Sequence, residues 1–110
     1  MKLTIVREDG AVYKDGYSFS DLDLSAIPTN VHALQFNGVV NKGWIEFADD
    51  DFGIKQQNEL IESLPSWAVV ALQKWEEAKA EIDAQVEAAK LSAEAKALAD
   101  VTQPTPSFSA

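Results

Sequence analysis

The chain has no cysteine, a single histidine (His32) and a single arginine (Arg7) among its 110 residues. The lack of cysteine excludes disulfides, thiolate catalysis and cysteine-based zinc sites. One guanidinium group cannot form the paired clamp with which proteins hold phosphate. The five glycines are scattered among turn signals rather than gathered in a phosphate-binding loop. We therefore expect a protein that is not an enzyme and that needs no cofactor.

Basic residues are also scarce, with nine Lys and Arg against 18 Asp and Glu and a net charge of −9. Binding to nucleic acid or to an anionic membrane depends on clustered basic side chains. No apolar run approaches the roughly 20 residues of a membrane-spanning helix. The first segment turns acidic at Glu8 and Asp9, which is too early for a signal peptide. We expect a soluble, cytoplasmically made protein whose partners are neither nucleic acids nor membranes.

Bulky apolar residues are concentrated before residue 50, in short β-branched segments that are separated by turn signals. Asn37-Gly38 is typical of a two-residue hairpin loop. The other turn signals are Glu8-Asp9-Gly10, Lys14-Asp15-Gly16 and Asn41-Lys42-Gly43. Strands are predicted at 3–7, 11–13, 17–19, 31–36 and 44–47, and 20–28 is predicted to be a loop or edge segment that closes over the sheet.

The last two predicted strands differ in their pattern. Alternation in the first places Val31, Ala33 and Gln35 on one face of the sheet and His32, Leu34 and Phe36 on the other. In the second strand Trp44 and Phe47 do not alternate. That strand is predicted either to be buried on both faces or to contain a bulge.

From Ser66 to Gln103 the chain has no glycine or proline, and good helix formers dominate. Ser63 is a candidate N-cap, with Pro65 in the first turn. A helix over 63–100 would be about 54 Å long beyond Pro65. The predicted fold is therefore α+β, with a small antiparallel β-sheet head at 1–62 followed by a long alanine-rich helix whose first turns pack on the head.

One stripe of this helix has bulky apolar residues in its N-terminal part and only alanine in its C-terminal part. Its members are three or four residues apart: Trp75, Ala78, Ile82, Val86, Ala89, Ala93 and Ala97. The repeat is 11 residues rather than seven, which favours a straight or slightly right-handed bundle. Alanine allows close approach but buries little apolar area. We predict that Ala89, Ala93 and Ala97 contact a partner protein, together with Phe108 of a flexible 101–110 tail.

Three groups of residues are candidates for chemistry, and each has a simpler structural interpretation. His32 lacks a recognisable nucleophile and orienting acid around it, so we expect a structural histidine. The run at 49–51 lacks the spacing of a calcium-binding loop, which indicates a solvated acidic turn and no metal site. Glu46 and Asp49 could in principle act as an acid–base pair, but a head of this size hardly supplies a substrate cleft.

The three tryptophans allow two interpretations. They could form a stacking platform for nucleic acid or carbohydrate. Trp67 and Trp75, however, are eight residues apart on one helical face, and the acidic composition disfavours nucleic acid. We expect Trp44, Trp67 and Trp75 to belong to the core.

Three stretches carry a resemblance to a known group of proteins. The first is 1–7 with Asp9-Gly10 and Val12-Tyr13, and the second is 22–25 with Ile27-Pro28 and 30–35. The third is formed by Ile45-Glu46-Phe47, Leu64-Pro65-x-Trp67-Ala68 and Trp75. Over about residues 1–80 the chain resembles small proteins that are encoded near the tail and tail-fibre genes of tailed bacteriophages. The resemblance implies a setting and assigns no role to individual residues.

This resemblance implies a structural protein of the virion, bound to tail or fibre proteins in several copies and made in the host cytoplasm. Copies of the chain itself are further possible partners. The alternative is a tail-fibre assembly chaperone that is absent from the mature virion. A third hypothesis is an acidic inhibitor of a host protein that mimics nucleic acid.

Overall fold

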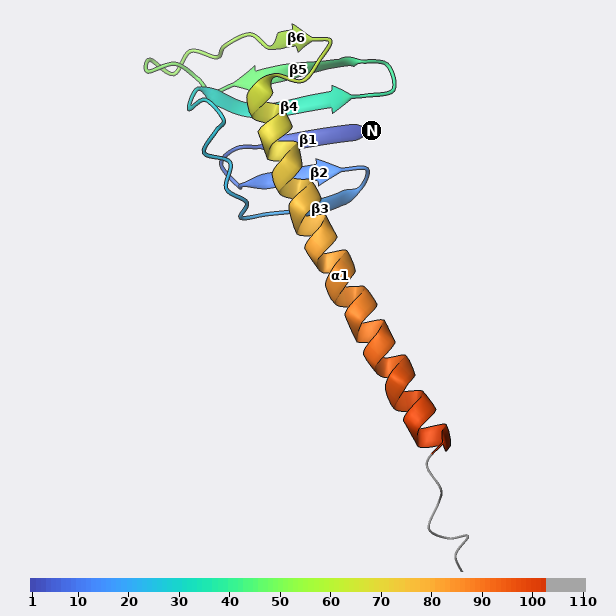
Figure 1. Ribbon diagram of the computed structural model, residues 1–110. Coiled ribbons are helices and arrows are strands. Elements are labelled where there is room, and N and C mark those ends of the chain that lie inside the picture. Colours follow the sequence, from blue (N-terminus) through green and yellow to red (C-terminus); the bar gives the residue numbers. More distant parts are fainter. Residues whose placement is uncertain (103–110) are drawn as a thin grey trace, which may run out of the picture. The chain divides into compact units, whose positions relative to one another are not determined.

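The computed structural model describes residues 1–102, and side chains through residue 97. The chain divides into two compact units, Met1–Ala78 (unit 1) and a second unit that begins at Lys79 (unit 2). The elements are β1 (Lys2–Val6), β2 (Ala11–Lys14), β3 (Tyr17–Phe19), β4 (Val31–Asn37), β5 (Lys42–Phe47), β6 (Glu59–Ile61) and α1 (Ser66–Thr102) (Figure 1). The predicted α+β class, an antiparallel sheet followed by one long helix, is confirmed.

The six strands form one sheet in the order β3-β2-β1-β4-β5-β6, and every neighbouring pair is antiparallel. β1 lies near the centre of the sheet because it pairs with β2 on one side and with β4 on the other. β6 was not anticipated from the sequence, which predicted no strand between residue 47 and the helix expected from residue 63. The two edges of the sheet are β3 and β6, of three residues each.

The turn of the second hairpin, between β2 and β3, follows the sequence signal. Asp15 and Gly16 both have positive φ angles, 49° and 84°, as a two-residue type I′ loop requires. The Asn37-Gly38 prediction was wrong, because β4 and β5 are joined by the four residues 38–41. Asn37 Oδ1 accepts a hydrogen bond from the Val39 amide at 2.9 Å, and Asn41 takes the positive φ of 51°. Both signals therefore serve a single longer loop.

β4 carries an irregularity that the sequence pattern placed in β5. The register between β4 and β5 shifts between Val31 and Ala33, which leaves His32 as the extra residue. This shift returns Val31 to the face that holds Leu34 and Phe36, and all three side chains are buried. The predicted division of 31–36 into two faces was therefore wrong on the N-terminal side of the bulge.

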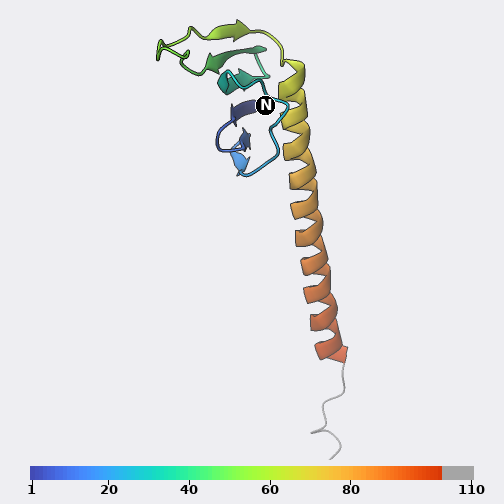
Figure 2. The same cartoon turned by 90° about the vertical axis from the view of Figure 1, so that its left-hand side faces the viewer.

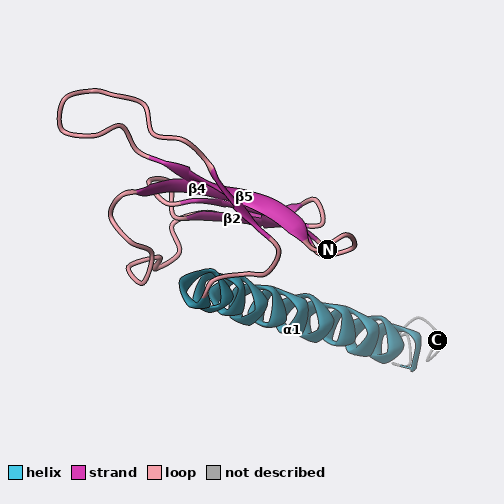
Figure 3. Ribbon diagram, turned by 90° about the horizontal axis from the view of Figure 1, so that it is seen from above, coloured by secondary structure: helices cyan, strands magenta, loops and turns pink. Residues whose placement is uncertain are grey.

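One face of the sheet is covered by the beginning of α1 and is called the covered face (Figures 2 and 3). Its core contains strand residues such as Leu3, Ile5 and Leu34, which are almost completely buried. Ala68, Ala71 and Trp75 contribute from the helix, and Trp67 is partly buried against them. The 20–28 segment is a loop, and it adds Leu24 and Ile27 to the same core.

Trp75 is the main anchor between α1 and the sheet within unit 1. Its Nε1 donates a hydrogen bond to the Tyr17 carbonyl at 2.9 Å, and its ring meets the Phe19 ring edge-on with centroids 6.0 Å apart. Lys14 Nζ lies 4.9 Å from the centroid of the same ring and forms an ion pair with Glu76. The indole is therefore buried with its one polar atom satisfied.

α1 begins two residues later than its expected capping pattern implies. The carbonyl of Pro65 accepts hydrogen bonds from the Ala68 and Val69 amides, at 3.0 and 3.1 Å, and the first helical residue is Ser66. Pro65 therefore stands before the first turn, so the assignment of Ser63 as N-cap was wrong. Pro65 tolerates this position because its missing amide has no helical partner there.

Unit 2 contains the helical residues 79–102. From 80 to 97 every side chain except Ile82 is exposed, including Val86 and Leu91. Lys79 Nζ forms an i,i+4 ion pair with Asp83 at 2.5 Å, and Gln85 donates to Glu81 at 3.5 Å. Such pairs stabilise an exposed helix by a few tenths of a kcal/mol each.

Candidate interaction surface

The second face of the sheet, called here the open face, has no helix over it within unit 1 (Figure 3). Strand pairing places one residue from each of five strands in a single line across it. Tyr13 pairs with Thr4, Thr4 with Gln35, Gln35 with Trp44, and Trp44 with Leu60. We call this line the cross-strand row.

The cross-strand row is apolar at its ends and hydrogen-bonded at its centre. Tyr13 is 44% exposed, Trp44 41% and Leu60 83%, which is high for side chains of this size. Between them Thr4 Oγ1 donates to Gln35 Oε1 at 2.6 Å. That bond satisfies the polar centre of the row and holds it in the plane of the sheet. The row thus presents two large rings and one leucine on either side of a fixed polar pair.

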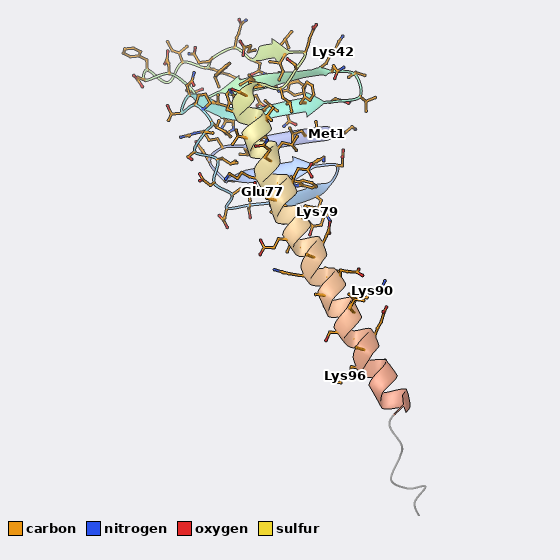
Figure 4. All side chains as sticks on the ribbon, viewed as in Figure 1. Met1, Lys42, Glu77, Lys79, Lys90 and Lys96 are labelled. Carbon is orange, nitrogen blue, oxygen red and sulfur yellow. The ribbon has the colours of Figure 1, made fainter. Side chains whose placement is uncertain are left out.

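The charges of the open face are separated along the strand direction. Lys2 and Lys42 occupy the positions next to the row at one end, where both pair in register with Asn37. Met1 and Lys42 lie at this same end of the sheet (Figure 4). Glu46 occupies the corresponding position at the other end and accepts a hydrogen bond from Trp44 Nε1 at 3.2 Å. Two lysines and one glutamate therefore make this face less acidic than the chain as a whole.

A shallow hollow lies between Trp44 and the two lysines. Its volume is about 300 Å³, and it is open to solvent on one side. It is lined by Lys2, Leu3, Thr4, Gln35, Phe36, Asn37, Lys42 and Trp44. A small apolar or anionic group of another molecule fits its lining.

Placing Trp44 in the core was wrong. Its neighbours in the strand, Gly43 and Ile45, face the helix, so Trp44 must point to the open face. Trp75 is 6% exposed, and with Trp67 it packs as predicted. A signal for the open face was present in the sequence, because Thr4, Tyr13 and Trp44 fall in one alternation phase of their strands. Only the register shows that they form a row.

The structure brings the proposed catalytic candidates to one place without making a catalytic arrangement. His32, Glu46 and Asp49 line a hollow of about 350 Å³ beside the bulge in β4. His32 and Asp49 are exposed, and Glu46 is bonded to Trp44. Among the described residues no hydrogen bond joins the imidazole to either carboxylate. The hollow thus lacks the nucleophile–base contact with which acyl-transfer sites begin.

The acidic run at 49–51 has a structural use. Asp50 Oδ1 accepts hydrogen bonds from the Phe52 and Ile54 amides at 2.9 and 2.8 Å, which fixes the turn that ends at Gly53. Across the part of the chain that the structure describes, no group of three or more His, Asp or Glu side chains is placed to hold a metal ion. The loop is therefore organised by its own backbone amides.

The predicted partner contacts on the helix are accessible. Ala89, Ala93 and Ala97 are all exposed in unit 2, whereas Phe108 lies outside the described residues. The side chains of Lys90 and Lys96 stand on the same helical segment (Figure 4). Partner binding by these alanines stays a prediction.

Comparison with protein-family models, with curated proteins and with solved structures returned no match. Within residues 1–102 no helix is both long and apolar enough to cross a membrane.

Proposed function

We propose that this chain is a non-enzymatic protein of a bacteriophage tail or tail fibre and acts by binding other proteins. The observation that carries the proposal is the cross-strand row, which leaves Tyr13, Trp44 and Leu60 exposed together on one face. Trp44 and Leu60 are direct neighbours across β5 and β6, and adjacent exposed apolar side chains of this size mark interaction surfaces. The resemblance of residues 1–80 to proteins encoded near tail genes supplies the setting.

The main alternative is an assembly chaperone for the tail fibre, which would use the same surface and then leave. Inhibition by nucleic-acid mimicry is less well supported by the charges. A mimic needs aligned carboxylates on a compact surface. The open face holds Lys2 and Lys42 against Glu46, and the exposed helix mixes lysines with acids.

Quantitative mass spectrometry of purified phage particles tests the proposal. A structural protein is present at a fixed number of copies per particle, in step with the tail proteins. A chaperone is absent from particles but co-purifies with fibre protein from infected cells. Absence from both samples while the chain is expressed would contradict both hypotheses.

A lysine-reactive cross-linker can then identify which surface binds the partner. Lys2 and Lys42 report on the open face, and Lys90 and Lys96 report on the exposed part of α1. If the alanine stripe binds the tail, partner cross-links concentrate on the second pair. Ala93→Arg should then reduce binding, while the matched change Ser92→Arg, one residue away on the helix, should not.

A further inference from the structure

We infer that the open face binds a second copy of this chain, in a face-to-face dimer whose twofold axis runs along the cross-strand row. The inference does not depend on the phage setting. It rests on the distribution of charged and apolar side chains at the two ends of the strands.

A twofold axis along the cross-strand row pairs opposite charges of the two copies. A twofold axis along the row places each strand over the same strand of the partner, running in the opposite direction. Lys42 and Glu46 stand two residues on either side of Trp44 in β5. The axis therefore brings Lys42 of each copy toward Glu46 of the other, with the two Trp44 rings between the pairs. A twofold interface is self-complementary in this sense.

The same axis also brings together exposed apolar residues from opposite ends of the strands. The loop that follows β5 exposes Phe52 and Ile54, and it extends on the side of the sheet away from α1 (Figure 3). The β4–β5 loop at the opposite end of the strands exposes Val39 and Val40. Reversing the strand direction brings the first pair of one copy to the second pair of its partner.

A different twofold axis, parallel to the strands, would also overlay the two faces. It would place β5 over β2 at the same level of the sheet, so Glu46 would lie over Ala11 and Lys42 would lie over the turn at Asp15. Desolvation does not separate the two axes, because the axis along the row places Lys2 over Val6 of the partner. An axis parallel to the strands, however, keeps each exposed apolar loop at its own end of the strands, so Phe52 and Ile54 of one copy would not meet Val39 and Val40 of the other. The axis along the row is therefore favoured.

The size of the face indicates a weak dimer. Six strands about 4.8 Å apart and five residues of about 3.3 Å each give a contact of roughly 1,000 Å² in total, at the low end for specific interfaces. The net charge of −9 opposes association of any two copies. That opposition is smallest at the open face, where lysines outnumber the acid.

Sedimentation of the full chain from about 1 μM to 1 mM is the first test, since interfaces of this size bind in the micromolar range or more weakly. We expect a monomer–dimer equilibrium that Trp44→Glu weakens at least tenfold. Val69→Glu is the matched control, because Val69 has the same 41% exposure but lies on α1. Thermal unfolding confirms that both variants are folded.

Charge exchange tests the axis itself. Lys42→Glu and Glu46→Lys should each abolish the homodimer, because each variant meets like charge across the axis. An equimolar mixture of the two should form a heterodimer, since each carboxylate then faces an ammonium group. A monomer at 1 mM, a dimer that Trp44→Glu does not affect, an oligomer larger than two, or no association on mixing would overturn the inference.

Discussion

The covered and open faces of the sheet use the same residue types with different outcomes. Trp75 on the covered side is 6% exposed with its indole nitrogen bonded to a carbonyl, whereas Trp44 on the open side is 41% exposed and bonded to a carboxylate. The first arrangement contributes to stability and the second leaves area free for a partner. The comparison shows that a tryptophan can be an anchor or a contact, according to whether it lies on the covered face or on the open face of the sheet.

Alanine substitution of Trp75 and of Trp44 should show the largest difference between the covered face and the open face. Trp75→Ala should cost roughly 3–5 kcal/mol of unfolding free energy, as large-to-small changes of buried aromatic residues do. Trp44→Ala should cost less than about 1 kcal/mol in the monomer, because Trp44 is already 41% exposed to water. Chemical denaturation at low protein concentration measures both. Equal losses would mean that the open face is part of the core.

Gly43 tests how closely β4 and β5 approach beneath Trp44. A Cβ at this position would lie 2.1 Å from the Gln35 carbonyl oxygen and 2.8 Å from the Phe36 Cα, and neither backbone group can move freely. Gly43→Ala should therefore cost about 3 kcal/mol, as overpacking in a core does.

Gly16 is the matched control, since its turn leaves open space around an added Cβ. Gly16→Ala should cost only about 1 kcal/mol for its positive φ. If both variants are equally stable, the two strands separate more easily than their register implies.

Ending the chain after Ala88 tests whether the covered core is complete without the later helix. The core helix residues Ala68, Ala71 and Trp75 remain, and the described side chains that are lost, 89–97, are exposed. We expect a cooperative thermal transition with a midpoint within a few degrees of the full chain, which corresponds to less than about 1 kcal/mol. A molten near-UV circular dichroism spectrum would place the alanine stripe in the core.

The smallest expected effect comes from the loop that supplies Leu24 to the covered face. The Ser25 hydroxyl and the Ser25 amide, the latter at 3.1 Å, lower the pKa of the Asp23 carboxyl below its ordinary value. A lowered folded-state pKa gives stability that is present above the unfolded pKa, near 4, and is lost as pH falls through the folded one. An NMR titration should find this low pKa, and Ser25→Ala should return it toward normal. An unchanged pKa in Ser25→Ala would assign the effect to another group.

Local signals predicted the fold where chemistry allowed few alternatives. Asp15-Gly16 could form a tight turn because both residues accept positive φ, and the glycine-free stretch after Pro65 could only be a long helix. The sequence did not decide which face of the strands would be covered. Val6, Tyr13 and Trp44 make the open alternation phase nearly as apolar as the covered one, so pattern alone put Trp44 inside. The bulge at His32 reverses the phase within β4, and it follows from pairing with β5 rather than from β4 itself.

The candidate surface was harder to predict because it exists only after pairing. Residues from β1, β2, β4, β5 and β6 meet in the cross-strand row, and no spacing along the chain connects them. β6 was missed for a related reason, since its three residues gain strand geometry from β5 and have little propensity of their own.

The short edges of the sheet have a consequence for how copies can assemble. β3 and β6 form the two edges of the sheet, and each offers only three residues to an incoming strand. Strand-by-strand growth, the route by which sheets lengthen into fibrils, finds little template here. A face-to-face contact about a twofold axis uses the open face of both copies, so no further copy can bind there. If the open faces pair as inferred, assembly stops at two copies, and Tyr13 and Trp44 are covered in the product.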